Sequence, residues 1–221
     1  DKLESIPGFE IEKTEEDFIS QVKDSGIAVI GQSDELVKAD KLLYALRDVT
    51  ATVDIIPLIA SSIMSKKIAS GSNAILLDVT VGDGAFMKNI EDARLLARTM
   101  VDLGKAVGRE TVAVLTNMNQ PLGYAIGNRN EITEAVNTLN GKGTSEFRHF
   151  IAELAQIMLS LAGIEKTVPE IIENLDNGKA YAKFLAMCKA QHGDATAFNH
   201  LTAELNVTHT AEIYAERAGY I

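Results

Sequence analysis

The sequence has few of the residues that stabilise small secreted domains, and no segment suited to crossing a membrane. Its 221 residues include no tryptophan and only one cysteine, Cys188. Because a disulfide needs two cysteines, none can form within the chain. A single cysteine suits a reducing cytosol, and we interpret Cys188 as a small core residue rather than a reactive thiol. No run of about 18 apolar residues occurs, and no signal-like segment begins the sequence. These absences predict a cytoplasmic protein.

Basic residues are also scarce. Lysine and arginine total 21 against 31 aspartate and glutamate residues, which leaves a net charge of -10. A nucleic-acid-binding protein usually carries a basic face, so this balance argues against that class. The four histidines are scattered, and none stands at metal-ligand spacing from another histidine or from the cysteine. They are His149, His192, His200 and His209.

Apolar runs alternate with helix-patterned stretches along the chain. Short apolar runs predict buried strands at 27–30, 71–79 and 111–115. Alternation of such strands with helices is typical of an α/β fold, so we predict a largely parallel sheet flanked by helices, with part of a small all-helical lobe. The predicted helices cover 14–26, 33–46, 54–71, 89–107, 131–139, 145–161, a stretch that begins at Thr167, and 177–191.

The predicted helix at 54–71 carries the clearest chemical pattern. Asp54 is placed to cap its N-terminus, Pro57 suits the first turn, and Ser62 and Lys66, four residues apart, share one face. Arg47 ends the preceding helix and can reach the same place. A guanidinium and an ammonium donate to two carbonyls, and a serine hydroxyl accepts from the N–H between them. The three groups therefore match the dione edge of uracil or thymine. Fixed cations would also stabilise the charge that grows on such a base as it leaves. The alternative is an amphipathic surface helix with solvated lysines.

The amino-acid sequence of this stretch resembles the pyrimidine-binding segment of the thymidine and pyrimidine-nucleoside phosphorylase family. The resemblance covers essentially the whole chain. It implies the central domain of a nucleoside phosphorylase, with Arg47, Ser62 and Lys66 binding the base. The segments that carry it are YALRDVTATVD at 44–54, PLIASSIMSKK at 57–67, LDV at 77–79, GDGAFMK at 82–88, LTNMNQPLG at 115–123, Ala211-Glu212 and Gly219-Tyr220-Ile221.

Two further sites follow from the same resemblance. The loop at 82–88 borders the base site, with Phe86 as an apolar wall, although Thr80 stands where the family commonly has lysine. From the residues alone, this glycine-containing loop is either a phosphate cradle or a plain tight turn. The second site is a potassium site, for which the resemblance supplies the carbonyls of Leu122 and Ala125 and the carboxylate of Glu134. From sequence alone Glu134 reads as an ordinary surface carboxylate.

The resemblance also implies parts that this sequence does not contain. The family's phosphate-binding segment and catalytic histidine would precede Asp1, and its C-terminal domain would follow Ile221. We therefore assign no catalytic residue here, and expect a central fragment without turnover. The domain prediction is an α/β part at 1–35, a helical lobe with the base-binding residues at 36–70, and the α/β part continued at 71–221.

The expected function is phosphorolysis of uridine, thymidine or deoxyuridine, giving free base and (deoxy)ribose 1-phosphate. Potassium is the expected ion, a homodimer the expected assembly, and no organic cofactor is expected. A rival is an anthranilate phosphoribosyltransferase-like enzyme, which shares the architecture but needs pyrophosphate and Mg²⁺ sites. A third interpretation is a non-catalytic folding or dimerisation module, in which apolar helices such as 39–46 form the interface.

Overall fold

The computed structural model describes residues 2–31, 37–194, 197 and 209–219, which form two compact units. The first unit comprises Asp1–Gly31, Gly123–Gln156 and Lys166–Ile221, and the second comprises Gln32–Leu122 and Ile157–Glu165. The second unit thus holds the predicted helical lobe together with the residues that follow it up to 122. The predicted division at 35 and 70 itself stays a prediction. His200, Tyr220 and Ile221 lie outside the described residues.

The first unit is helical in the part that the structure describes. Its helix α8 (Lys179–Ala190) packs against α1 (Glu15–Ser25), α5 (Asn128–Leu139) and α7 (Val168–Asp176). Its core includes Ile6, Phe9, Ile132 and Cys188. Burial raises the pKa of the Cys188 thiol to about 11, so it is an inert core residue, as predicted. The elements are η1 (Leu3–Ser5), α1 (Glu15–Ser25), α5 (Asn128–Leu139), the start of α6 (Ser145–Leu161), α7 (Val168–Asp176) and α8 (Lys179–Ala190).

The strand predicted at 27–30 is wrong, because a buried side chain holds this segment instead of a neighbouring strand. The Gln191 side chain is fully buried, and its Oε1 accepts a hydrogen bond from the Val29 N–H at 3.0 Å. Its Nε2 donates to the Val29 carbonyl at 2.7 Å and to the Glu10 carbonyl at 2.8 Å. One glutamine thus pairs both backbone groups of Val29, so the segment needs no sheet partner.

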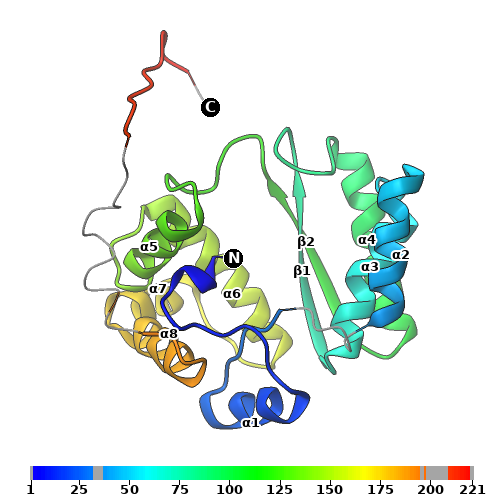
Figure 1. Ribbon diagram of the computed structural model, residues 1–221, viewed down its shortest axis with the longest axis horizontal. Coiled ribbons are helices and arrows are strands. Elements are labelled where there is room, and N and C mark those ends of the chain that lie inside the picture. Colours follow the sequence, from blue (N-terminus) through cyan, green and yellow to red (C-terminus); the bar gives the residue numbers. More distant parts are fainter. Residues whose placement is uncertain (1, 32–36, 195–196, 198–208, 220–221) are drawn as a thin grey trace. The chain divides into compact units, whose positions relative to one another are not determined.

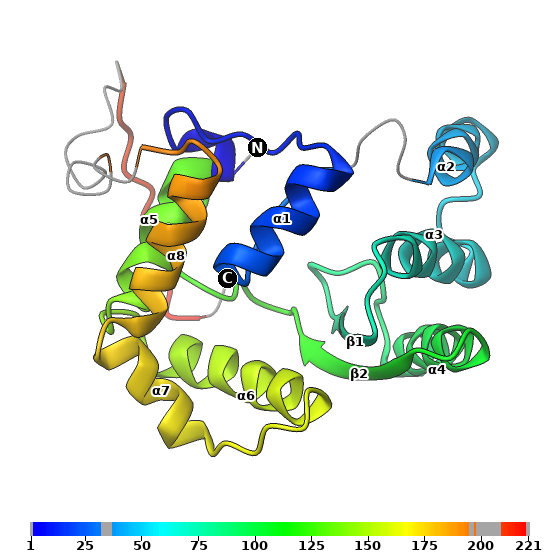
Figure 2. The same cartoon turned by 90° about the horizontal axis from the view of Figure 1, so that it is seen from below.

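The second unit contains a two-stranded parallel sheet covered by helices. Strands β1 (Ala74–Val81) and β2 (Glu110–Asn117) pair in register from Ala74 opposite Glu110 to Val81 opposite Asn117. Both views show α2 (Lys38–Thr50), α3 (Ile56–Ala69) and α4 (Ile90–Ala106) on the same side of this sheet (Figures 1 and 2). The α/β class and the parallel pairing predicted from the sequence are confirmed, with a sheet smaller than the three predicted strands.

The core of the second unit lies between the sheet, α3 and α4. Alternate residues of β1, Ile75, Leu77 and Val79, are buried against Met64 of α3 and Met100 of α4. This alternation follows from the period of two in a strand with one covered face. The packing fixes the positions of α3 and of the end of β1.

Helix α3 begins one residue later than a cap at Asp54 requires. Ile55 occupies the N-cap position, and its carbonyl accepts from the N–H groups of Leu58 and Ile59 at 2.9 and 3.0 Å. The predicted cap at Asp54 is therefore wrong, whereas Pro57 lies in the first turn as predicted. The helix ends at Ala69, and Gly71 follows with φ +78°, a conformation that glycine adopts without strain. Among the described residues, no helix has both the length and the apolar character needed to cross a membrane.

Candidate functional site

The Arg47 side chain is buried beneath the segment that joins α2 to α3. Only 7% of the residue is exposed. Its Nε donates to the Thr52 carbonyl at 3.3 Å and its Nη1 to the Leu58 carbonyl at 3.2 Å, while Nη2 makes a close hydrogen bond to the Val53 carbonyl. The Tyr44 ring lies 5.2 Å from the guanidinium carbon, within cation–π range. Arg47 thus organises the connection that positions α3, and two of its five N–H groups are not used by these three bonds.

Ser62 and Lys66 meet at the carboxylate of Asp40, which was not among the predicted site residues. The Lys66 Nζ lies 3.0 Å from the Ser62 Oγ, as expected for residues four apart on α3. Both side chains also bind one oxygen of Asp40: Lys66 donates to it at 2.5 Å and Ser62 at 3.1 Å. Asp40 lies on α2, seven residues before Arg47 and hence on the same face of that helix. That spacing was the available signal for Asp40.

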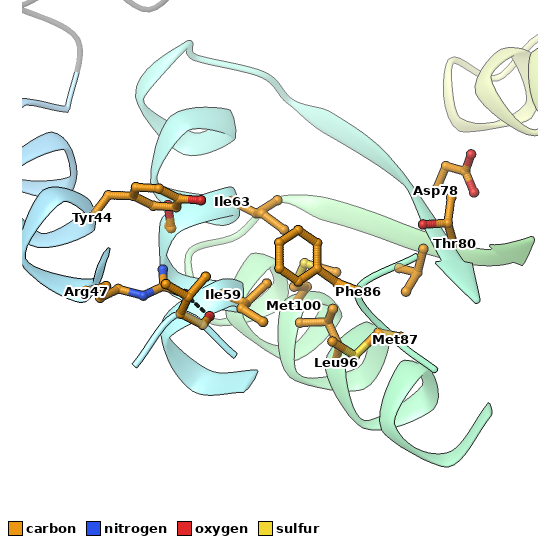
Figure 3. Close-up of a pocket in the computed structure, with 13 residues that line it drawn as sticks. Tyr44, Arg47, Ile59, Ile63, Asp78, Thr80, Phe86, Met87, Leu96 and Met100 are labelled. Atoms are coloured by element: carbon orange, nitrogen blue, oxygen red, sulfur yellow. Dashed lines mark hydrogen bonds between the residues drawn. The ribbon is translucent and has the colours of Figure 1, made fainter. Parts of the chain in front are cut away.

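A cavity of about 250 Å³ opens beside these residues (Figure 3). Arg47, Ser62 and Phe86 all line it, so the structure brings three of the four predicted base-binding residues to one hollow. Lys66 is not among the lining residues, and reaches the site only through Ser62 and Asp40. The walls are mostly apolar, as is usual for small-molecule pockets. They include Tyr44, Ile59, Ile63, Met87, Leu96 and Met100.

Phe86 comes to the cavity from the loop after β1. In Figure 3 its ring lies between Arg47 and Tyr44 on one side and Asp78 and Thr80 on the other. The side chain is 68% exposed, so the ring forms an outer wall and not part of the packed core. Thr80, which stands where the family commonly has lysine, also lines the cavity. The wall of the cavity at residue 80 is therefore uncharged.

The loop at 82–85 is a closed turn. Gly82 has φ +136°, and a Cβ there would lie 2.5 Å from the Asn119 Oδ1, so glycine is required for both reasons. Each of the four N–H groups donates within the unit, which leaves none for an anion and confirms the tight-turn alternative. In chain order the acceptors are the Met87 carbonyl, the Asn119 side chain, the Met118 carbonyl and the Gly82 carbonyl, at 3.0, 3.1, 2.9 and 3.0 Å.

The predicted potassium ligands fall in both units. Leu122 belongs to the second unit, and Ala125 and Glu134 belong to the first. Within the first unit the Glu134 carboxylate, on α5, accepts from the Tyr124 N–H at 2.9 Å and from the Ala125 N–H at 3.3 Å. A Cβ on Gly123 would lie 2.2 Å from Glu134 Oε2, so glycine allows the chain to pass this carboxylate. Glu134 therefore holds the backbone at 123–125 and is not a free surface carboxylate. Its oxygens and nearby carbonyls are the ligand type that a hard cation prefers.

The histidines form no metal site in the part of the chain that the structure describes. His149 lies 3.3 Å from Glu153 on the same helix, and His192 lies 3.8 Å from Glu10. Both pairs are exposed at the surface. No group of three or more histidine, cysteine or acidic residues is close enough to hold a metal ion among the described residues.

Comparison with known proteins agrees with these features. Residues 1–181 match the glycosyl transferase family, a/b domain. A pyrimidine-nucleoside phosphorylase from Staphylococcus haemolyticus (strain JCSC1435) is 49% identical over 225 residues, and one from Geobacillus stearothermophilus is 48% identical over the same length. Each alignment covers 100% of this chain and 52% of the relative, so the chain spans about half the length of these curated relatives. The chain therefore belongs to the glycosyl transferase family, in its a/b domain, and is a homologue of pyrimidine-nucleoside phosphorylases.

Proposed function

We propose that this chain holds the pyrimidine base in a pyrimidine-nucleoside phosphorylase, an enzyme that splits uridine, thymidine or deoxyuridine with phosphate. The observation that carries the proposal is the shared cavity of Arg47, Ser62 and Phe86, with the Lys66 ammonium 3.0 Å from the Ser62 hydroxyl. A guanidinium, a hydroxyl and an aromatic ring that line one cavity suit a flat, polar-edged ring. The similarity to pyrimidine-nucleoside phosphorylases supports the same assignment.

In the proposed reaction, phosphate attacks C1′ of the sugar, the glycosidic bond breaks, and its electron pair leaves with the base. The negative charge then spreads onto the two carbonyl oxygens of the dione. Arg47 is fixed by three backbone carbonyls, so its remaining N–H groups are oriented before the base arrives. A preoriented cation stabilises the departing base more than the neutral bound nucleoside. We assign no catalytic residue to this chain; its role is to bind and orient the leaving group.

Lys66 has a less direct place in the proposal. Its three N–H groups point to Asp40, the Ser62 carbonyl and the Ser62 hydroxyl. A contact with the base would require one of these bonds to be given up. While all three bonds are kept, Lys66 contributes only its positive charge, from a position behind Ser62.

Potassium, with the Ala125 carbonyl and the Glu134 carboxylate as ligands, belongs to the same proposal, and Leu122 stays a predicted ligand. The ion would supply a fixed positive charge that holds nearby backbone in place. A homodimer and a cytoplasmic location also stay predictions. The exposed apolar residues of α2, Leu42, Leu43, Leu46 and Val49, are consistent with an interface on the predicted helix.

The base-binding proposal is tested by titrating the complete gene product with uracil in a calorimeter. We expect Ser62→Ala to weaken uracil binding by about tenfold, since a buried hydrogen bond is lost. Ser61→Ala is the matched control, because Ser61 is the exposed neighbour on the same helix, and it should leave uracil binding unchanged. Phosphorolysis of uridine by the same protein tests the reaction. Binding of phosphoribosyl pyrophosphate with Mg²⁺, and not of uracil, would favour the phosphoribosyltransferase alternative and contradict the proposal.

A further inference from the structure

The Ser62 hydroxyl has neighbours that fix the direction of its hydrogen. On one side lies an oxygen of the Asp40 carboxylate, which can only accept, at 3.1 Å. On the other lies the Lys66 ammonium, which can only donate, at 3.0 Å. The single hydroxyl hydrogen must therefore point to Asp40, and one oxygen lone pair accepts from Lys66. The hydroxyl keeps one free position, and that position is an acceptor.

Asp40 is held firmly enough to impose this direction. Its side chain is 11% exposed and pairs with the Lys66 ammonium at 2.5 Å. It is not among the residues that line the cavity, so it touches no ligand there and acts only through Ser62. A carboxylate in this position behaves as a positioning residue for the hydroxyl in front of it.

We infer that Asp40 sets which pyrimidine the cavity accepts, by forcing Ser62 to receive a hydrogen bond at the ring nitrogen between the two carbonyl positions. This inference rests on the proposed function. Uracil and thymine carry N–H at that nitrogen and satisfy the free acceptor. Cytosine carries a bare nitrogen there, which is also an acceptor, so two lone pairs would face each other. A buried polar group that is left without a hydrogen-bond partner costs more binding free energy than one added hydrogen bond contributes. Cytosine should therefore be excluded from the cavity.

The inference predicts a change in preference and not merely in affinity. Asp40→Ala frees the Ser62 hydroxyl to turn and donate to the ring nitrogen of cytosine. We expect the ratio of uracil to cytosine affinity to fall by about tenfold or more, mainly because cytosine binds better. Asp40→Asn keeps one acceptor oxygen, and a single Asp40 oxygen accepts both bonds in the structure, so this conservative variant should keep most of the parent ratio. Asp102→Asn is the matched control, since Asp102 is an exposed aspartate of α4 in the same unit, and it should leave the ratio unchanged.

The experiment measures uracil and cytosine affinities of the complete gene product and these variants by calorimetry. A Ser62→Ala background completes the design: once the hydroxyl is gone, Asp40→Ala should not change the ratio further. If Asp40→Ala weakens both bases equally, or changes the ratio just as much without the Ser62 hydroxyl, the inference is overturned. If Asp40→Ala does not fold, the ratio of Asp40→Leu, which also removes the acceptor oxygen, decides. A parent protein that binds neither base overturns the proposed function. A parent that prefers uracil, with an unchanged preference in the variant that lacks the Asp40 acceptor, overturns the role of Asp40 alone.

Discussion

Replacing Arg47 with lysine separates the charge of this side chain from its geometry. Lysine keeps the positive charge but offers one ammonium in place of a planar fork. In the structure the fork donates to the carbonyls of Thr52, Leu58 and Val53 and lies over the Tyr44 ring. An ammonium can serve one of these carbonyls well and leaves the other two without their donor. We therefore expect Arg47→Lys to loosen the connection between α2 and α3.

The expected cost follows from the bonds that are lost. Hydrogen bonds to a charged group contribute about 1.5–3 kcal/mol each when buried. Two are lost, but the carbonyls lie beside a cavity that water can enter, so the lower end of the range applies. The cation–π contact adds about 0.5–1 kcal/mol. The free energy of unfolding should therefore fall by about 3–4 kcal/mol. Under the proposed function, base binding should also weaken, because the remaining N–H groups lose their orientation.

The measurement is urea unfolding followed by circular dichroism, together with hydrogen exchange of peptides that cover residues 51–58. Exchange is needed because a chain with two compact units need not unfold in one step. Arg98→Lys is the control, since Arg98 is an exposed residue of α4, and it should stay within about 0.5 kcal/mol of the parent. If Arg47→Lys is as small in effect as this control and exchange at 51–58 is unchanged, the guanidinium does not hold this segment and the reasoning fails.

Two further predictions concern carboxylates of the first unit. The Thr167 backbone N–H, with Lys166 and the Thr167 hydroxyl, lowers the pKa of Glu170 from 4.5 to about 2 in the capping box of α7. Because the pKa of Glu170 is lower in the folded state than in the unfolded state, its ionised carboxylate stabilises the folded protein above pH 4.5. This contribution is lost as the pH falls toward 2. The stability difference between the parent and Glu170→Gln should therefore shrink from pH 6 to pH 3, and a constant difference across urea titrations would contradict it. If Glu134 binds potassium, the parent should melt a few degrees higher in KCl than in NaCl of equal ionic strength, because an ion that binds only the folded state stabilises it. Glu134→Gln should abolish that difference and Glu131→Gln, on the same helix, should keep it; equal melting of the parent in both salts would refute the potassium proposal.

Local signals in the sequence predicted most of the helices. Thr14 and Thr167 cap α1 and α7, and Asn89 caps α4, each accepting a backbone N–H as their residue type favours. These contacts lie within a few residues, so the pattern alone contains them. The run at 27–30 misled because its partner, Gln191, is about 160 residues away. A lone polar side chain that takes the place of a strand leaves no periodic trace in the sequence.

The candidate site shows the same limit. The spacing of Ser62 and Lys66 on one helix correctly predicted that their side chains meet. The resemblance to the family predicted that Arg47 and Phe86 lie near them. The seven-residue spacing places Asp40 on the face of α2 that carries Arg47, but its contacts with Ser62 and Lys66 depend on the crossing of α2 and α3, which spacing on one helix does not predict. The three carbonyl bonds of Arg47 were missed for a related reason: backbone acceptors in a connecting segment carry no sequence signature.

The turn at 82–85 is complete in itself, with all four of its N–H groups engaged inside the unit. The turn leads into Phe86, whose ring lines the cavity, and it leaves none of its own four N–H groups for an anion. Under the proposed function, binding of the departing base and binding of the attacking phosphate would therefore fall to different segments of the polypeptide. If the proposal holds, substitutions in this cavity can change the choice of nucleobase without altering how phosphate is recognised.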